Sequence, residues 1–337
     1  MIPHSKTRQS NLSRRQCLAA AGAGALALGF GSARSASAAA ATIRQGYQTN
    51  IWGMPTYYLL KSGYLEKRGI DVADFAVPSG NITMQQMVAR QVDLGTYAGP
   101  SFIIGNAKGG LIAIAVIEHV GKTARITARK DLNITKIEQL RGKRIANQTG
   151  SSVGNDLVDI VLPKHGLNKG DYTEVRMDVN NMVAALAAKT VDAMVNVEPY
   201  NVIAVADGIG TDLGDFSSFD SMPVFMAATP DFVQQKPDAV VAYLKAWLDA
   251  AHDFKDNPQK VNDVIYKFYS DKGYKMSAET FATAMSRVEV SPGFPDNLKP
   301  YMQQQAEILM KENIIKTVPD WSTALRPDFM AKAKAGA

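Results

Sequence analysis

Cysteine and histidine are scarce in this sequence, which narrows the chemistry that it could support. The 337 residues contain one cysteine, Cys17, and four histidines. Cys17 falls in an N-terminal segment that we expect to be removed, so the remaining chain offers no disulfide, cysteine zinc site, iron–sulfur ligation or thiol nucleophile. His119, His165 and His252 are scattered without metal-ligand spacing or an acid partner, and we interpret them as structural. The sequence therefore predicts no metal site and no cofactor.

An excess of one charge is also absent beyond the N-terminal segment. The whole chain has 37 Lys and Arg against 32 Asp and Glu, but residues 1–38 hold five of the basic residues and no acid. The remainder has 32 of each and is neutral. A neutral chain does not indicate a nucleic-acid surface, and we predict no nucleic-acid partner.

Long apolar runs are lacking as well, and the one weakly apolar run belongs to a targeting pattern. Arg14 and Arg15 lie in a motif that resembles the twin-arginine export signature, and the run 19–30 that follows is too short to span a bilayer. Ala36-Ser37-Ala38 then supplies a cleavage pattern. A disordered, alanine-rich N-terminus is the alternative. We predict a twin-arginine signal peptide over residues 1–38, cleavage near Ala38, and a periplasmic location.

Strand-like and helix-like segments alternate through the first half of the remaining chain. The order βαβαβ predicts an α/β fold in which a mostly parallel sheet is flanked by helices. A second, similar series begins near residue 126, and long helical patterns follow residue 230. We predict two lobes, each a mostly parallel sheet flanked by helices, with crossings near 124–129 and 224–228. Residues 42–126 and 225–330 would form lobe 1, and residues 127–224 would form lobe 2. The segments predicted as strands are 43–47, 72–77, 92–95, 111–117, 144–146, 173–177 and 193–195. The segments predicted as helices are 55–68, 84–90, 101–107, 137–140, 153–165, 182–189, 239–254, 258–269, 278–287 and 298–312.

Four polar segments follow predicted strands, where ligands of parallel α/β sheets bind beside helix N-termini. They are residues 48–53, 78–81, 96–101 and 147–152. The last combines Gly150 with Thr149, Ser151 and Ser152 before a helix, which suits an anionic group. Helix capping by Ser151 or Ser152 alone is an equal alternative, and no Gly-Lys-Ser/Thr follows as in a nucleotide-binding loop.

Glu198 and several aromatic residues are further candidates. Glu198 follows a predicted strand and could meet an amine or another donor of a ligand, with Tyr200 as a wall of the pocket. The alternative is a solvated Glu before a helix that starts at Pro199. Trp52 and Tyr97 could line a cleft or belong to the core, and Tyr47 fits the core better because it ends a strand.

Several of these segments together resemble the nitrate/sulfonate/taurine-type solute-binding proteins of ABC transporters, which are related to the thiamine-pyrimidine synthases. The likeness covers most of residues 42–230 in the order typical of that family. It is carried by residues 43–48 (IRQGYQ), 63–70 (GYLEKRGI), 92–95 (VDLG), 140–146 (LRGKRIA), 191–193 (VDA) and 198–200 (EPY).

The resemblance implies a periplasmic binding protein type II fold with a hinge and a ligand between the lobes. It implies an ABC permease and an ATPase as partners of a monomeric binding protein. It also implies recognition of a sulfonate or similar anion through backbone N–H and hydroxyl groups. The four polar segments contain no Arg or Lys, however, so a neutral or cationic ligand stays an alternative. With Trp52 added, the predicted ligand-binding residues are Gln48, Trp52, Ser79, Gly80, Asn81, Tyr97, Ala98, Gly99, Gln148, Thr149, Gly150, Ser151, Ser152 and Glu198.

Three function classes follow from this sequence. The first, which we favour, is capture of a small organic anion by lobe closure without chemistry, and a thiamine-pyrimidine precursor or another amine is the alternative ligand. The second is an enzyme on the same fold, but the related synthases carry a cysteine-rich motif that is missing beyond Cys17, and only Glu198 could serve as an acid or base. The third is a sensory module that docks on a membrane receptor.

Overall fold

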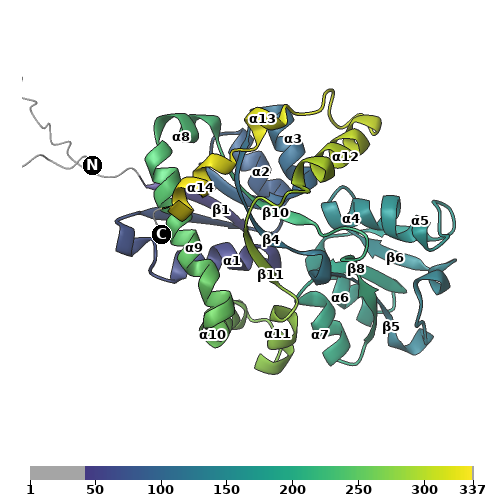
Figure 1. Cartoon of the computed structure of the whole chain (residues 1–337). Coiled ribbons are helices and arrows are strands. Elements are labelled where there is room, and N and C mark those ends of the chain that lie inside the picture. The colour runs from purple at the N-terminus through teal and green to yellow at the C-terminus, as the bar shows by residue number, and fades with distance from the viewer. Residues whose placement is uncertain (1–41, 336–337) are drawn as a thin grey trace, which may run out of the picture. The chain divides into compact units, whose positions relative to one another are not determined.

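Two mixed β-sheets organise residues 42–335, the part of the chain that the computed structural model describes (Figure 1). Helices cover both sheets, so the predicted two-lobed α/β fold is confirmed. The predicted signal peptide lies outside the described residues. Within residues 42–335, no helix combines the length and the apolar character that crossing a bilayer demands.

The larger sheet has six strands in the order β11-β4-β10-β3-β1-β2. Strand β1 pairs in parallel with β2 and β3, whereas β10 runs antiparallel to both β3 and β4, and β11 antiparallel to β4. Every residue of β3 and β10 is buried, as expected of strands covered on both faces. The bounds are β1 Ile43–Gln48, β2 Val72–Val77, β3 Leu94–Ala98, β4 Ile112–His119, β10 Pro223–Ala228 and β11 Glu289–Gly293.

Two separate hydrophobic clusters cover the two faces of this sheet. One cluster contains Tyr58, Tyr243 and Ile265, and the other contains Met87 and Phe102. The first face packs against α1 (Met54–Lys61), α9 (Pro237–Asp256), α10 (Pro258–Asp271) and α14 (Pro327–Ala335). The second face packs against α2 (Gly80–Val88), α3 (Gly99–Gly109) and α12 (Leu298–Lys311). The shorter helices of this lobe are α8 (Pro230–Gln235), α11 (Ala278–Met285) and α13 (Trp321–Ala324).

The smaller sheet has five strands in the order β7-β6-β8-β5-β9. Strand β6 is parallel to β7 and β8, and β5 is antiparallel to β8 and β9. In Figure 1, α4 and α5 lie on one side of this sheet and α6 and α7 on the other. The bounds are β5 Ala124–Arg129, β6 Arg144–Asn147, β7 Thr173–Arg176, β8 Ala193–Val197, β9 Gly210–Asp215, α4 Ser152–Asp156, α5 Leu162–Lys164, α6 Val179–Ala187 and α7 Tyr200–Ala206; a π-helical turn, Leu157–Val161, joins α4 to α5.

The chain passes between the sheets twice within this arrangement. It leaves the larger sheet after β4, builds the smaller sheet from β5 to β9, and returns with β10. The lobe boundaries suggested by the sequence, 42–126 with 225–330 and 127–224, stay a prediction.

The structure differs from the sequence-based expectation in the type of sheet and in several elements. The sheets are mixed rather than mostly parallel, because β10 and β5 enter antiparallel where the chain crosses between them. Strands β5, β9, β10 and β11 were not predicted, and the segments of β5 and β10 were expected only as crossings between the lobes. Strand β9 (GTDLGD) lacks apolar alternation, and β11 contains Pro292 and lies at an edge, where proline is tolerated. The helix expected over 55–68 ends at Lys61, and a short 3₁₀ turn, Glu66–Arg68, replaces its second half.

Candidate functional site

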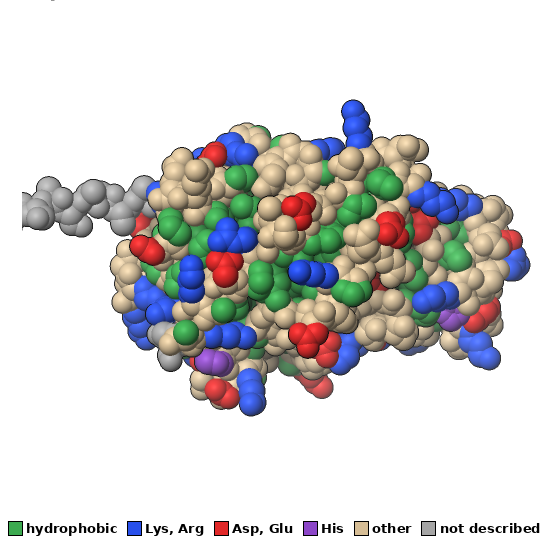
Figure 2. Space-filling view, turned by 45° about the horizontal axis from the view of Figure 1, so that its top comes forward, with side chains coloured by type: hydrophobic (Ala, Val, Ile, Leu, Met, Phe, Trp, Pro, Cys, Tyr) green, Lys and Arg blue, Asp and Glu red, His purple; other side chains and the backbone are tan. Residues whose placement is uncertain are grey.

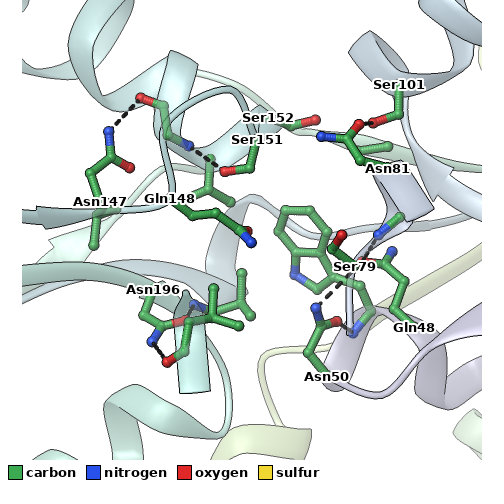
Figure 3. Close-up of a pocket in the computed structure, with 18 residues that line it drawn as sticks. Gln48, Asn50, Ser79, Asn81, Ser101, Asn147, Gln148, Ser151, Ser152 and Asn196 are labelled. Carbon is green, nitrogen blue, oxygen red and sulfur yellow. Dashed lines mark hydrogen bonds between the residues drawn. The ribbon is translucent and has the colours of Figure 1, made fainter. Parts of the chain in front are cut away.

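A cavity with about 510 Å³ of empty space, including the part that opens to solvent, lies between the two sheets (Figure 3). Four strands end at it: Gln48 is the last residue of β1, Ala98 of β3, Asn147 of β6 and Val197 of β8. Two of these strands belong to each sheet. Its lining residues are Gln48, Asn50, Trp52, Ser79, Gly80, Asn81, Ala98, Ser101, Asn147, Gln148, Ser151, Ser152, Val153, Gly154, Val179, Val195, Asn196 and Val197.

Helices begin where these strands end. Gly80 starts α2, Ser152 starts α4 and Val179 starts α6, and all three residues line the cavity, while α3 starts directly after the lining residue Ala98. The first N–H groups of a helix have no partner within it, and the helix dipole places partial positive charge there. The cavity therefore receives positive potential from backbone groups of both lobes.

Two glycines let these helix starts approach the cavity closely. A Cβ on Gly80 would lie 2.7 Å from Tyr97 Cβ and 3.3 Å from Gln48 Nε2, and one on Gly154 would lie 2.3 Å from the carbonyl oxygen of Gln148. Real Cβ atoms essentially never come within 3.0 Å of such an atom, so the contacts with Tyr97 Cβ and with the carbonyl oxygen of Gln148 could not form without a shift. The close approach of backbone to the cavity thus depends on glycine at both positions.

Hydrogen bonds fix the wall that the larger lobe supplies. Gln48 Oε1 accepts from the backbone N–H of Gly80 at 3.1 Å and from Asn50 Nδ2 at 3.4 Å. Asn50 Oδ1 accepts from Trp52 N at 3.0 Å, and the Trp52 indole donates to Thr123 Oγ1 at 2.6 Å. Because Thr123 lies in the first crossing between the sheets, the indole is held between the lobes.

The wall of the smaller lobe is also built from amides and a capped helix. Asn147 Nδ2 donates to the carbonyl of Gly154 at 3.2 Å and to Glu174 Oε1 at 2.8 Å. Ser151 Oγ accepts from Gly154 N at 3.0 Å, so Ser151 is the N-cap of α4 and also lines the cavity. Asn196 Nδ2 donates to the carbonyl of Val179 at 2.9 Å and so connects β8 to the start of α6.

One side chain connects the two walls directly. Asn81 Nδ2 donates to the carbonyl oxygen of Gly150 at 3.2 Å, and Asn81 Oδ1 accepts from Ser101 Oγ at 2.7 Å. The loops 79–81 and 148–152 therefore meet at one edge of the cavity. The lobes are in contact there in this structure.

The described lining residues include no acid, base, cysteine or histidine. Six amide side chains and four serines surround the cavity, together with Trp52 and several valines. Such a set can bind a polar molecule and hold it away from water, but it has no side chain of the kind that usually moves a proton. Among residues 42–335, no three His, Cys, Asp or Glu side chains are grouped so that they could hold a metal ion.

The sequence-predicted residues divide into two groups in the structure. Nine of them line the cavity: Gln48, Trp52, Ser79, Gly80, Asn81, Ala98, Gln148, Ser151 and Ser152. Of the others, Tyr97 is fully buried against α2, with its hydroxyl 3.3 Å from Met87 Sδ, and Gly99 faces Tyr301 of α12. Thr149 donates to Glu174 at the surface, and Gly150 receives the bond from Asn81. A ligand-binding role for all of them stays a prediction.

Glu198 also lies outside the cavity lining, in a different environment from the one expected. Its side chain is fully buried, pairs with Arg287 and accepts from the backbone N–H of Val202 at 3.0 Å. Burial raises the pKa of Glu198, and the guanidinium groups of Arg287 and Arg125 oppose that rise. The carboxylate therefore joins the smaller lobe to the segment after α11.

The list of predicted ligand-binding residues left out several residues that line the cavity. Asn50, Ser101 and Asn147 lie within the polar segments predicted from the sequence, 48–53, 96–101 and 147–152, but they were not among the predicted ligand-binding residues. Asn196, an amide within an otherwise buried strand, carried a signal of its own. The valines gave no such signal, because a Val in a strand or helix has the same appearance in any core. The full set is Asn50, Ser101, Asn147, Val153, Gly154, Val179, Val195, Asn196 and Val197.

Residues 50–261 match the family described as NMT1/THI5-like, which is more than half of the chain. The chain belongs to the NMT1/THI5-like family. This match includes both walls of the cavity apart from Gln48, and it confirms the likeness to solute-binding proteins and pyrimidine synthases that the sequence segments indicate.

Curated relatives of this family member have two kinds of name. A Brucella abortus protein with the provisional name of a binding protein is 28% identical over 234 residues, which are 67% of this chain and 71% of that protein. A Brachyspira hyodysenteriae protein, provisionally named an ABC transporter periplasmic binding protein, is 23% identical over 71% of this chain and 72% of its own length. The 4-amino-5-hydroxymethyl-2-methylpyrimidine phosphate synthase of Schizosaccharomyces pombe is 21% identical over 71% of this chain and 72% of its own length.

Solved structures share the fold over most of the chain. The periplasmic aliphatic sulphonate binding protein SsuA from Escherichia coli superimposes with a TM-score of 0.74 at 21% identity, covering 85% of this chain and 92% of SsuA. The periplasmic nitrate-binding protein NrtA from Synechocystis PCC 6803 gives a TM-score of 0.69 at 16% identity, covering 88% of each chain. The arrangement of two lobes is thus that of periplasmic binding proteins.

Proposed function

We propose that this chain is the periplasmic solute-binding component of an ABC importer. It captures a small organic molecule in the cavity between the lobes and presents it to a permease and an ATPase. The observation that carries this proposal is the cavity itself, since both sheets direct strand ends and helix N-termini into it.

The cavity favours a ligand that has an electronegative group. Helix starts from both lobes present backbone N–H groups, which suit a sulfonate, nitrate-like or carbonyl oxygen. Cationic side chains are absent from the described lining residues, so binding relies on dipoles and hydrogen bonds. The names of SsuA and NrtA support an oxyanion, and the name of the yeast synthase supports a pyrimidine precursor as the alternative ligand.

Capture without chemistry fits the lining better than catalysis does. A dehydratase or synthase needs a positioned acid and base, and the candidate from the sequence, Glu198, is paired with Arg287 outside the cavity. On the face that Figure 2 presents, basic and acidic side chains are interspersed among hydrophobic ones, so this face carries no large patch of one charge of the kind that binds nucleic acid.

A ligand screen tests this function. Thermal unfolding is measured with sulfonates, carboxylates, amides, amines and pyrimidines, and any stabilising compound is recovered and identified by mass spectrometry. We expect at least one compound to raise the melting temperature and to be recovered unchanged. A compound that is converted during incubation would instead support the enzyme.

A pair of variants locates the binding in the cavity. Ser79→Trp places an indole into the cavity and should abolish the stabilisation, whereas Ser218→Trp, at an exposed loop position, should leave it intact. Stabilisation that survives Ser79→Trp would place the ligand elsewhere and contradict the proposal.

A further inference from the structure

Two buried carboxyl groups meet where α4 of the smaller lobe contacts the segment that returns to the larger sheet. Asp156 is the last residue of α4 and is 4% exposed, and Asp220 lies between β9 and β10 and is 6% exposed. The two side chains are hydrogen-bonded to each other. Two ionised carboxylates cannot form such a bond, because neither has a hydrogen to donate, so one of the two carries a proton here.

The neighbours of Asp220 identify it as the acceptor of the pair. Its Oδ1 accepts from the backbone N–H of Met222 at 2.7 Å, and its Oδ2 accepts from the Tyr301 hydroxyl and from Gln305 Nε2, both at 3.0 Å. Three donors stabilise the ionised form of this carboxyl. Around Asp156, burial and the charge of Asp220 instead raise the pKa. The proton therefore belongs to Asp156, which donates to Asp220.

The titratable groups of the larger lobe leave this shared proton in place. Tyr301, on α12, keeps its own proton, because burial and the two aspartates raise the pKa of its hydroxyl far above the usual value. His119, the last residue of β4, is near Asp220, but burial lowers the pKa of its imidazole, while Glu289 and Asp220 oppose that fall. The imidazole is therefore neutral at pH 7 and supplies no cation that would let both aspartates ionise.

A second pair of carboxyls crosses the same contact at its exposed edge. Glu312, the residue after α12, is bonded to Asp159 of the π-helical turn that follows α4. Burial and the charge of Asp159 raise the pKa of Glu312, and Lys169, which pairs with Asp159 at 3.7 Å, opposes the rise. After burial and Asp220, the charge of Asp159 also contributes to the raised pKa of Asp156. The contact between the lobes thus brings carboxyl groups together from both sides.

Helix α4 links the aspartate pair to the ligand cavity. Gly154 of this helix lines that cavity, and Asp156 follows two residues later. Asp220, by contrast, is held by Tyr301 and Gln305 of α12, which packs against α3 on the larger sheet. In Figure 1, α4 and α12 lie next to each other where the lobes meet, and a smaller cavity lined by Asp156 and Gln305 lies between them. A motion that opens the ligand cavity by carrying α4 away from α12 would separate the two carboxyls and expose them to water.

We propose that closure of the lobes over a ligand takes up one proton, which Asp156 then shares with Asp220. The inference rests on the proposed solute-binding function and adds a pH dependence to it. Carboxyls exposed to water in an open form have the ordinary Asp pKa of about 3.9 and are ionised near neutral pH, whereas the closed form holds one of them protonated. Low pH therefore favours the closed form that retains the ligand, and rising pH favours release.

Small-angle X-ray scattering of the purified, ligand-free chain between pH 5 and pH 8 tests the proposal. We expect the radius of gyration to increase with pH, because uptake of one proton lets the ratio of closed to open molecules fall by up to about 10-fold per pH unit. Asp156→Asn keeps the shape of the side chain and replaces the O–H donor with an N–H donor, so this variant should stay compact at pH 8. Asp263→Asn, at an exposed position of α10, should behave as the wild type. A wild-type radius that does not change with pH, or the same increase in Asp156→Asn, overturns the inference.

Calorimetry separates this inference from the function on which it rests. Binding of ethanesulfonate is measured at pH 7 in phosphate and in Tris, whose different ionisation enthalpies reveal how many protons the chain takes up per bound molecule. We expect up to about one proton for the wild type and close to none for Asp156→Asn and for Asp156→Ala, which has no carboxyl to protonate. Binding without proton uptake keeps solute capture and refutes the proton linkage. If ethanesulfonate does not bind, a pH-dependent radius that is lost in Asp156→Asn supports the aspartate pair even though sulfonate capture fails.

Discussion

Removing Arg287 should expose how strongly the fold depends on a buried ion pair between distant segments. Glu198 is fully buried, and Arg287, whose side chain is 23% exposed, is its charged contact. In Arg287→Met the carboxylate keeps only the N–H of Val202 and the more distant charge of Arg125. An unpaired charge at such a site is so unfavourable that the carboxyl takes up a proton instead.

The free energy needed to keep the Glu198 carboxyl protonated sets the expected loss of stability. An unfolded Glu has a pKa of about 4.3, and each unit costs about 1.4 kcal/mol, so holding Glu198 protonated at pH 7 costs about 3.5 kcal/mol. Since the pKa in the folded variant lies far above the unfolded value, stability falls as pH rises, and the loss shrinks to about 1 kcal/mol at pH 5. Because the pKa of Glu198 is already raised in the intact pair, we expect Arg287→Met to lose somewhat less than this, about 3 kcal/mol at pH 7.

Urea unfolding between pH 5 and pH 8, followed by tryptophan fluorescence, measures this loss. The control is Glu198→Gln combined with Arg287→Met, in which a neutral amide keeps the bond from Val202 and most of the stability should return. A loss below about 1 kcal/mol at pH 7, or a loss that is equal at pH 5 and pH 8, would refute the reasoning.

Other positions give further measurable expectations. Burial raises the pKa of Glu118 well above its ordinary value, so the folded chain holds a proton that the unfolded chain releases, and stability falls as pH rises above about 4. In Glu118→Gln the melting temperature should therefore change less between pH 5 and pH 8, and an unchanged slope would contradict this. Burial alone would raise the pKa of Asp253, but Lys260 and two tyrosine hydroxyls hold it well below its ordinary value. Asp253→Asn should therefore lower the free energy of unfolding in urea by about 1–3 kcal/mol at pH 7. The difference from the wild type should shrink as pH falls below about 4, and a constant difference would show that the charge is unimportant. Gly80→Ala should destabilise the chain by about 1–3 kcal/mol and weaken every cavity ligand, because the new methyl group meets Tyr97; wild-type affinity in this variant would show that α2 can shift freely.

The sequence predicted the elements that have a strong local signal. The polar segments 48–53, 78–81, 96–101 and 147–152, which contain Gly, Ser and Asn, follow apolar runs, and their place after predicted strands indicates that they meet at the edges of two sheets. Nine of the proposed residues consequently line one cavity. Strands β9 and β11 lack that signal, since one contains two glycines and the other a proline, and only their pairing partners make them strands.

Contacts between distant residues could not be predicted in the same way. Glu198 has the appearance of a ligand contact at a strand end, but Arg287, 89 positions later, folds back onto it. Tyr97 and Ala98 are neighbours in a strand that is buried on both faces, so alternation alone could not show that Tyr97 packs against Met87 while Ala98 lines the cavity. Such assignments depend on which helix covers which face.

The position of β10 has a consequence for how the chain assembles during synthesis. This strand lies between β3 and β4, which do not pair with each other, and it follows β4 by more than a hundred residues. Until residues 223–228 leave the ribosome, β3 and β4 each keep an open edge that another chain could join. The five-stranded sheet, whose strands are contiguous in sequence, is free to form first and to deliver β10 to the gap. A nascent chain stalled so that residues up to about 220 have left the ribosome should therefore protect the five-stranded sheet from protease while β1 to β4 are still cut.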